Sequence, residues 1–238
     1  IQLLAAAQQP PHLKALMPLS VRPTMYQNIY RGGILCTGAE RFQALYATNK
    51  EFRSYAEIEN SPEELKRKMK ERWENDPDIQ ALPYFLRLLT TWPPRLNSWL
   101  LDIVMHPLDD DFWKARETRN KWHKVKVPIY LTGYWEPHGA YQPFVPFMDP
   151  TMNVPKKVLI WGTYLHTLKL PFRYYNEELI RWYDHWLKGV DTGIMDEPPV
   201  KIFVMGPNKY RFENEWPLAR TKWTKFYLRR SGRLSTEP

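Results

Sequence analysis

VKVPIYLTGYW at residues 125–135 and KKVLIWGTY at residues 156–164 are the stretches that decide the fold. Both are short apolar runs without a helical period, which predicts buried strands. HLKALMPLSV at 12–21 predicts a short buried strand followed by a loop, and VKIFVMG at 200–206 alternates like a half-buried strand. A helix is predicted over 176–188, between the second and the last of the long apolar stretches. Strands and helices that alternate along a chain predict an α/β sheet.

Residues 24–120 carry a different pattern, which is typical of helices. Ser61 precedes a proline and two glutamates, and this capping-box spacing predicts a helix over 62–75. Further helices are predicted at 79–91 and 95–105. The middle of the chain therefore resembles a mostly helical insertion between strands of the sheet.

Composition limits the class of protein. The chain has 238 residues, of which 43% are hydrophobic and 25% are charged, so global disorder is excluded. No apolar run approaches the roughly 18 residues of a membrane-spanning helix. The single cysteine, Cys36, excludes an intramolecular disulfide framework and a cysteine-built zinc site. The net charge is +8, and residues 201–238 hold nine basic residues against three acidic ones. Charge gathered on one segment predicts a solvated or partner-facing surface rather than a nucleic-acid site.

The chemistry is expected at the ends of strands. The sequence contains no P-loop, GxGxxG, HExxH, CxxC, EF-hand or GxSxG motif, so no cofactor and no metal are predicted. In an open α/β sheet, reactive groups lie in the loops after the carboxyl ends of the strands. Glu136 follows the first long apolar stretch and His166 follows the second. A carboxylate and then a histidine is the late part of the hydrolase order Ser, Asp/Glu, His.

A carboxylate that holds an imidazole allows the imidazole to take a proton from a serine hydroxyl. Glu136 can also be read as an ordinary loop carboxylate, and Asp149 is the reserve acid if Glu136 points away. His106 has no evident partner in the sequence and is expected to be structural.

Several motifs resemble the CocE/NonD family of serine hydrolases, which includes cocaine-esterase-like and X-Pro dipeptidyl-peptidase-like enzymes. HPLDDDFW at 106–113 resembles the segment that ends the family's helical cap. VPIYLTGYWE at 127–136 resembles its strand and turn with the triad acid, and WGTYLH at 161–166 resembles its GPWxH with the triad histidine. RWYDHWLKGVDTGIMDEPPVKIFVMG at 181–206 is the most specific match. The similarity covers essentially the whole chain.

The resemblance implies an α/β fold with three parts. Residues 1–23 and 121–196 would form the C-terminal half of an α/β-hydrolase domain. Residues 24–120 would form a helical cap insertion, and residues 197–238 would begin a C-terminal β jelly-roll domain. The acidic run 109–111 is expected to make hydrogen bonds in the cap or its hinge; in one branch of the family a carboxylate cluster binds the substrate ammonium.

The resemblance also implies the cleavage of a small-molecule ester or amide by a Ser-His-Asp/Glu triad. His166 would be the general base and Glu136 would orient it. The chain begins like the helix after the family's GxSYxG motif, so the serine is expected just upstream of Ile1. This chain alone is then expected to be inactive in acyl transfer. No nucleic-acid or membrane partner is expected, whereas family members often form homo-oligomers.

Two departures from the family pattern keep a second hypothesis open. The family usually has aspartate where this chain has Glu136, and GTYLH replaces GPWxH before and at His166. Glutamate is an accepted triad acid, but its longer side chain requires the backbone to compensate. The alternative function is a non-catalytic binding or assembly module that uses the basic, aromatic residues of 201–238.

Overall fold

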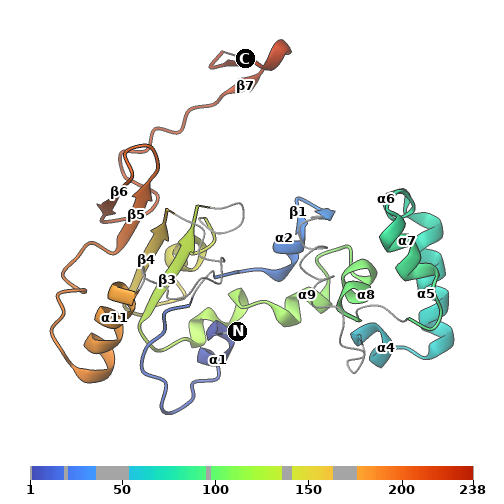
Figure 1. The fold of residues 1–238 in the computed structure, drawn as a ribbon, viewed down its shortest axis with the longest axis horizontal. Helices are drawn as coiled ribbons and strands as arrows, with labels where there is room; N and C mark the ends of the chain where they lie inside the picture. Colours follow the sequence, from blue (N-terminus) through green and yellow to red (C-terminus); the bar gives the residue numbers. More distant parts are fainter. Residues whose placement is uncertain are drawn as a thin grey trace. The chain divides into compact units, whose positions relative to one another are not determined.

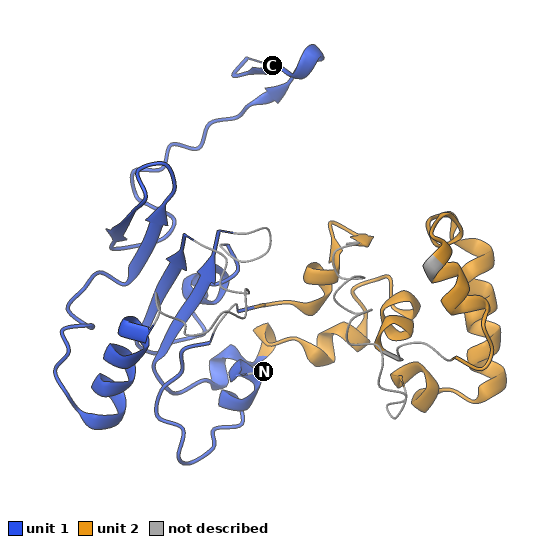
Figure 2. Cartoon of the chain, in the orientation of Figure 1, with its two compact units in different colours: residues 1–21, 121–238 blue, residues 22–120 orange. Residues whose placement is uncertain are grey.

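The computed structural model describes residues 2–18, 21–35, 54–94, 98–135, 141–162 and 176–237, with the backbone alone at Tyr84 and Ser98. The chain divides into two compact units (Figure 2). Unit 1 contains residues 1–21 and 121–238, and unit 2 contains residues 22–120. Each unit has a hydrophobic core of its own. Within the described ranges, no helix is both long and apolar enough to cross a membrane.

Unit 1 is built on a four-stranded sheet in the order β3-β4-β5-β6 (Figure 1). The strands are β3 (Ile129–Tyr134), β4 (Lys156–Trp161), β5 (Val200–Val204) and β6 (Lys209–Glu213). β3, β4 and β5 are parallel, and β6 returns antiparallel beside β5. The register pairs Ile129 with Lys156 and Tyr134 with Trp161, so β3 and β4 start and end together. The predicted α/β sheet is therefore present in unit 1.

The two faces of this sheet are covered by different helices. On one face, alternate residues of β3, β4 and β5 pack with α1 (Gln2–Ala6) and α10 (Phe144–Met148). On the other face, the intervening residues, among them Tyr130 and Trp161, pack with Trp182 of α11 (Asn176–Lys188). This arrangement follows from the two-residue period of a strand, because both faces of β3 and β4 are buried almost throughout.

The N-terminal segment contributes one residue to the sheet. Of the short strand and loop predicted over 12–21, the described residues contain one parallel bridge, between Leu16 and Ile129. The Leu16 N–H donates to the Pro128 carbonyl at 2.9 Å, and the Tyr130 N–H donates to the Leu16 carbonyl at 2.9 Å. Pro18 follows two residues later and lacks an N–H donor, so it cannot extend the ladder on its donor side.

The predicted helix 176–188 is confirmed as α11. Gly189 follows its last residue with φ of +71°, a left-handed conformation that glycine adopts without a side-chain clash. The Gly189 N–H donates to the His185 carbonyl at 3.2 Å and so satisfies one carbonyl of the final turn.

Unit 2 is mainly helical. Its elements are α2 (Met25–Ile29), β1 (Tyr30–Arg31), β2 (Ile34–Leu35), α4 (Tyr55–Glu59), α5 (Pro62–Asn75), α6 (Pro77–Ala81), α7 (Pro83–Thr90), α8 (Ser98–Met105) and α9 (Asp111–Arg116). The 3-10 helix η1 (Arg119–Lys124) leads from unit 2 into unit 1. The buried side chains of the core of unit 2 come from most of these elements, with Phe85, Leu101 and Trp113 completely buried.

Helix caps set the boundaries in unit 2. Ser61 accepts a hydrogen bond from the Glu64 N–H, and α5 spans the residues predicted for it. The full reciprocal capping box is formed by Ser54 and Glu57 at the start of α4. The predicted helix 79–91 is divided into α6 and α7, because Leu82 is extended before Pro83. A residue before proline is driven out of the helical conformation by the proline ring.

Residues 197–213 differ from the expectation of a separate β domain. β5 and β6 continue the sheet of β3 and β4, so the sheet of unit 1 extends to Glu213. The Pro198-Pro199 pair precedes a strand of this sheet, and the Pro199 carbonyl accepts from the Val158 N–H at 2.8 Å. Prolines lack only the donor, so they fit at the start of a strand. The three-part domain division as a whole stays a prediction.

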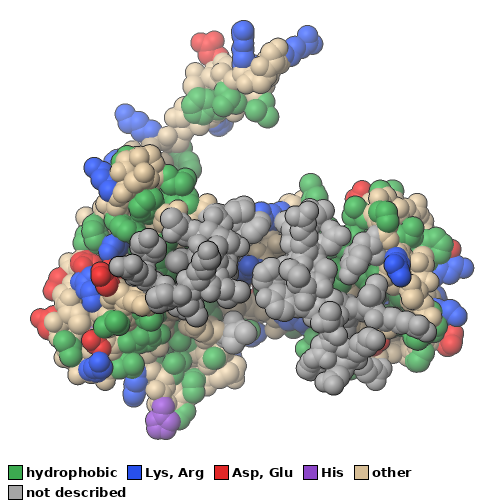
Figure 3. Space-filling view, viewed as in Figure 1, with side chains coloured by type: hydrophobic (Ala, Val, Ile, Leu, Met, Phe, Trp, Pro, Cys, Tyr) green, Lys and Arg blue, Asp and Glu red, His purple; other side chains and the backbone are tan. Residues whose placement is uncertain are grey.

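The C-terminal segment, residues 214–237, has little regular structure. β7 (Tyr227–Leu228) pairs with β8 (Leu234–Ser235) on either side of the 3-10 helix η2 (Arg230–Gly232), so the predicted strand 223–229 is two residues long. Trp223 and Leu228 are 84% and 87% exposed. Figure 3 shows hydrophobic and basic side chains close together on this segment.

Candidate active site

The two predicted catalytic residues, Glu136 and His166, lie outside the residues that the structure describes. The strands that precede them are described. Tyr134, the last residue of β3, is the register partner of Trp161, the last residue of β4. Because these neighbouring strands are parallel, the chain leaves both of them at the same edge of the sheet. This is the edge at which open α/β sheets place their reactive groups.

Trp135, the residue before Glu136, is fixed to two neighbouring strands. Its backbone N–H donates to the Trp161 carbonyl at 3.2 Å. Its indole Nε1–H donates to the Phe203 carbonyl on β5 at 2.6 Å. The starting point of the segment that carries Glu136 is thus defined by contacts to both β4 and β5.

Gly162, the residue after β4, lies against the ring of Phe203. A Cβ built on Gly162 would be 2.1 Å from Phe203 Cδ1 and 2.3 Å from Cε1. These distances are far inside van der Waals contact, so glycine is required here for space. The first step of the chain from β4 toward His166 is therefore also defined.

Asp149, the reserve acid, lies near the opposite edge of the sheet. Its backbone carbonyl accepts from Lys156 Nζ at 3.0 Å, and Lys156 is the first residue of β4. At about 3.3 Å per residue, a six-residue strand separates its two ends by about 16 Å. The Asp149 carboxylate accepts from the Thr151 N–H at 2.9 Å and the Thr151 hydroxyl at 2.5 Å. These contacts assign Asp149 to a local turn, away from the edge that Glu136 follows.

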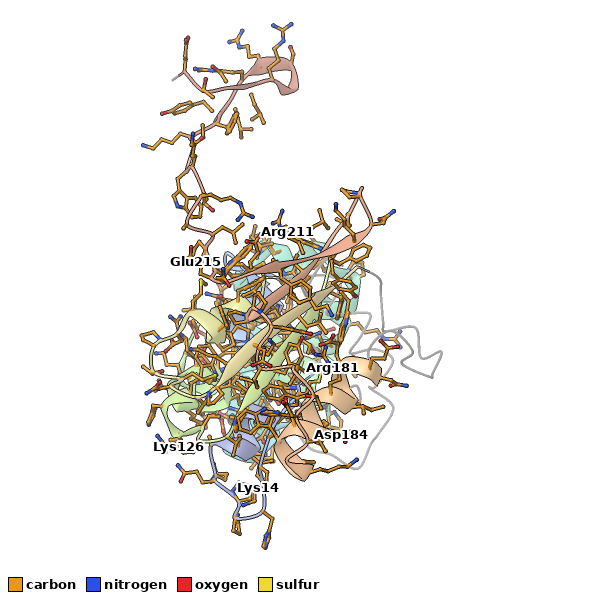
Figure 4. The ribbon with its side chains drawn as sticks, turned by 90° about the vertical axis from the view of Figure 1, so that its left-hand side faces the viewer. Lys14, Lys126, Arg181, Asp184, Arg211 and Glu215 are labelled. Atoms are coloured by element: carbon orange, nitrogen blue, oxygen red, sulfur yellow. The ribbon has the colours of Figure 1, made fainter. Side chains whose placement is uncertain are left out.

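A buried ionic network joins α11 to the first half of the strands. Glu178 accepts from the Tyr130 hydroxyl at 2.9 Å and from Lys201 Nζ at 2.5 Å. Burial is the main cause that raises the pKa of Tyr130, and the negative charge of Glu178 raises it further. Arg181, labelled in Figure 4, extends the network through Glu197 at 2.6 Å. Its members bond one another and connect α11 with β3 and β5, which indicates a structural role.

The acidic run 109–111 and His106 form a local structure in unit 2. His106 Nδ1 lies 2.7 Å from Asp110 Oδ2, so the prediction that His106 has no partner is wrong. Asp110 also caps α9, because its Oδ1 accepts from the Phe112 N–H at 3.1 Å. The His106 ring stacks on Phe112 with 4.1 Å between the ring centroids. The partner was hidden because Asp110 is one of three consecutive aspartates. The hydrogen-bonding role predicted for this run holds for Asp110.

Unit 2 contains an open cleft of about 740 Å³ between α4, α5 and the segment after α8. Its polar groups are largely engaged with one another. Lys68 bonds Asn60 at 2.6 Å, and Arg72 donates from Nε to the Val104 carbonyl at 2.9 Å. His106 in its lining is held by Asp110. Lys68, Arg72 and His106, the three lining side chains that can carry positive charge, are thus each bonded within the protein.

The described part of the chain contains no group of three or more His, Cys, Asp or Glu residues able to hold a metal ion. Sequence reasoning missed Trp135 and Phe203 at the candidate edge. Trp135 lies directly between a buried strand and the candidate acid, and this position is a signal from which its place at the edge could have been predicted. Phe203 carries no such signal, because its role depends on how β5 pairs with β4.

Comparison with known proteins places the chain in a family. Residues 1–145 match the family model of X-Pro dipeptidyl-peptidases, the S15 family, and this is more than half of the chain. The chain belongs to this family. Cocaine esterase of Rhodococcus sp. (strain MB1 Bresler) is 25% identical to this S15-family chain over 157 residues. The match covers 60% of the chain and 27% of the esterase, so the chain spans only a part of that relative's length.

Solved structures share the fold of this S15-family chain. A CocE/NonD family hydrolase of Staphylococcus aureus matches with a TM-score of 0.61 and 21% identity, over 99% of this chain and 36% of the other. An aminopeptidase of a marine sediment Thaumarchaeota archaeon matches with a TM-score of 0.62 and 16% identity, over 99% and 40%. The resemblance to CocE/NonD hydrolases that the sequence motifs indicate is confirmed.

Proposed function

We propose that this S15-family chain supplies the acid and the base of a serine hydrolase that cleaves a small-molecule ester or amide. The observation that carries the proposal is the shared edge of β3 and β4, where Tyr134 and Trp161 are paired and from which Glu136 and His166 follow in the sequence. Family membership supports it. One relative is named as an esterase, and the family is named for a peptidase. The chemistry common to both is acyl transfer, in which a nucleophile attacks a carbonyl carbon and displaces an alcohol or an amine.

In the proposed reaction, a serine upstream of Ile1 attacks the substrate carbonyl carbon. His166 accepts the hydroxyl proton as the C–O bond forms, and then gives it to the departing alcohol or amine. Water attacks the acyl-enzyme next, and His166 accepts its proton and returns it to the serine. Glu136 bonds the imidazole, fixes its tautomer and stabilises the imidazolium. No cofactor takes part in this scheme.

The test uses the full protein that the gene encodes, with p-nitrophenyl acetate and Gly-Pro-p-nitroanilide as substrates. We expect His166→Ala to lower kcat/KM at least about 1,000-fold on the better substrate, because the serine loses its base. His123→Ala is the matched control, since His123 is exposed in η1. A change below about threefold in His166→Ala would overturn the proposal.

A second measurement tests the pairing of Glu136 and His166 without turnover. The chain has six histidines, and the His166 Cε1–H resonance is the one that His166→Ala removes. A neighbouring carboxylate favours the charged imidazole, so we expect Glu136→Gln to lower the pH midpoint of the His166 titration. An unchanged midpoint would show that the two side chains do not interact.

A further inference from the structure

Three strand ends of unit 1 are tied together by one residue. Trp135 donates its backbone N–H to Trp161 on β4 and its indole N–H to Phe203 on β5. β4 lies between β3 and β5 in the sheet. Neighbouring strands are about 4.8 Å apart, so the indole reaches across roughly two strand spacings to the Phe203 carbonyl. The contact holds the end of β3 in a set position relative to β4 and β5.

The Phe203 side chain restricts the backbone at Gly162, where the chain leaves β4 at the same edge of the sheet. The regular pairing of β4 with β5 is recorded to Ile160 and Ile202, one position before Trp161 and Phe203. Beyond it, the Phe203 ring fills the space next to Gly162, where even a methyl group would lie within 2.6 Å of three ring carbons. The Gly162 backbone therefore passes against the ring with no room for a side chain.

These contacts contribute little to the cores of unit 1. Trp135 is 40% exposed and belongs to neither core cluster, and Phe203 is half-buried. An indole N–H at an exposed position can bond water instead, so its bond to Phe203 adds only a modest stabilisation. The effect of the contacts is mainly geometric: they fix where the chain leaves β3 and β4.

We propose that Trp135, Gly162 and Phe203 form an edge clamp that positions the acid and the base of the proposed hydrolase. The inference rests on the proposed function, since Glu136 directly follows Trp135 and His166 comes four residues after Gly162. The clamp residues are positioning residues and do not touch the reacting atoms. A misplacement of about 1 Å can lower a rate about 100-fold, so a few tenths of an ångström at either exit are significant.

The first test removes the indole donor. Trp135→Phe keeps an aromatic ring but cannot donate to the Phe203 carbonyl. In the gene-encoded protein we expect kcat to fall about 10- to 100-fold while KM stays within about twofold. In the 238-residue chain we expect the pH midpoint of the His166 titration to fall toward that of Glu136→Gln. Trp92→Phe is the matched control, because Trp92 is 37% exposed and lies in unit 2.

The second test uses the steric contact, in case Trp135→Phe does not fold. Gly162→Ala places a methyl group against the Phe203 ring, and we expect a loss of kcat similar to that of Trp135→Phe. Phe203→Ala removes the ring but keeps the carbonyl that accepts from Trp135. The double variant Gly162→Ala/Phe203→Ala is therefore expected to regain at least about tenfold in kcat over Gly162→Ala.

The outcomes separate the edge clamp from the proposed function. If Glu136→Gln shifts the His166 titration but folded Trp135→Phe leaves titration and kcat unchanged, the clamp is wrong and the hydrolase proposal stands. If Glu136→Gln leaves the titration unchanged, the pairing fails and the clamp fails with it. The clamp is also overturned if Gly162→Ala is fully active, or if removing the Phe203 ring gives no recovery.

Discussion

Asp102 is a buried carboxylate that holds two helices of unit 2 together. It belongs to α8, and its Oδ1 accepts from the Ala56 N–H at 2.8 Å while its Oδ2 accepts from the Tyr55 N–H at 3.1 Å. It thereby satisfies two of the free donors in the first turn of α4. Burial raises the pKa of Asp102, and the two backbone donors only partly offset this effect.

The raised pKa predicts a pH dependence of stability. An unfolded aspartate titrates at about pH 3.9, so between that pH and the folded pKa the folded state binds more protons than the unfolded state. The contribution of Asp102 to the free energy of unfolding therefore decreases as pH rises through this window. We expect the advantage of the parent over Asp102→Asn, measured by urea unfolding, to be larger at pH 4 than at pH 7.

The control for this prediction is Asp78→Asn, because Asp78 is an exposed carboxylate in the first turn of α6. If the difference between parent and Asp102→Asn does not change with pH, or grows toward pH 7, the assignment to burial is wrong.

At the level of elements, the attachment of α11 to the sheet depends on the buried Glu178 and its partly buried partner Lys201. We expect Glu178→Gln to lower the free energy of unfolding by about 2 kcal/mol, because it removes the counter-charge of a partly buried ammonium. Glu178→Gln/Lys201→Met is expected to recover most of this loss. The measurement is denaturant unfolding followed by far-UV circular dichroism, with Glu177→Gln, exposed on the same turn, as the control. Additive losses in the double variant would contradict the prediction.

Elements with local signals could be predicted from the sequence, and those that depend on long-range pairing could not. α5 and α11 were predicted to the residue, since Ser61 and Gly189 mark a start and an end by local chemistry. The division between α6 and α7 also has a local cause, Pro83, which the helical pattern obscured. β6 was not predicted, because KYRFE alternates charged and aromatic residues and is a strand only beside β5.

The candidate site likewise has some features that the local sequence shows and others that depend on long-range contacts. The order of strand, acid, strand and histidine is written in the sequence, and the parallel register of β3 and β4 agrees with it. The bond from Trp135 to Phe203 joins residues 68 apart, and no local pattern encodes it. Asp149 is located by the hydrogen bond from Lys156 Nζ to its backbone carbonyl. The sequence does not show this contact, because it depends on where β4 begins.

At the level of the whole molecule, the C-terminal segment combines exposed apolar residues with basic charge. Trp223 and Leu228 form part of an unusual amount of exposed apolar surface for a short segment. We expect the 238-residue chain to self-associate, and Trp223→Ser/Leu228→Ser to shift it toward the monomer in light scattering coupled to size-exclusion chromatography. Association that salt of about 1 M abolishes would instead indicate an ionic contact, because exposed charges are then screened beyond about 3 Å.

Unit 1 is formed by two stretches that are far apart in the sequence, and this affects how it folds during synthesis. Leu16 pairs with Ile129, and Pro18 accepts from Thr132, 114 residues later. At a synthesis rate of about 5 to 20 residues per second, the first partner waits roughly 6 to 23 s for the second to leave the ribosome. All of residues 22–120 emerges in that interval. The helical unit can therefore become structured while the opening segment is still unpaired, so the apolar residues of that segment stay uncovered until β3 has been synthesised.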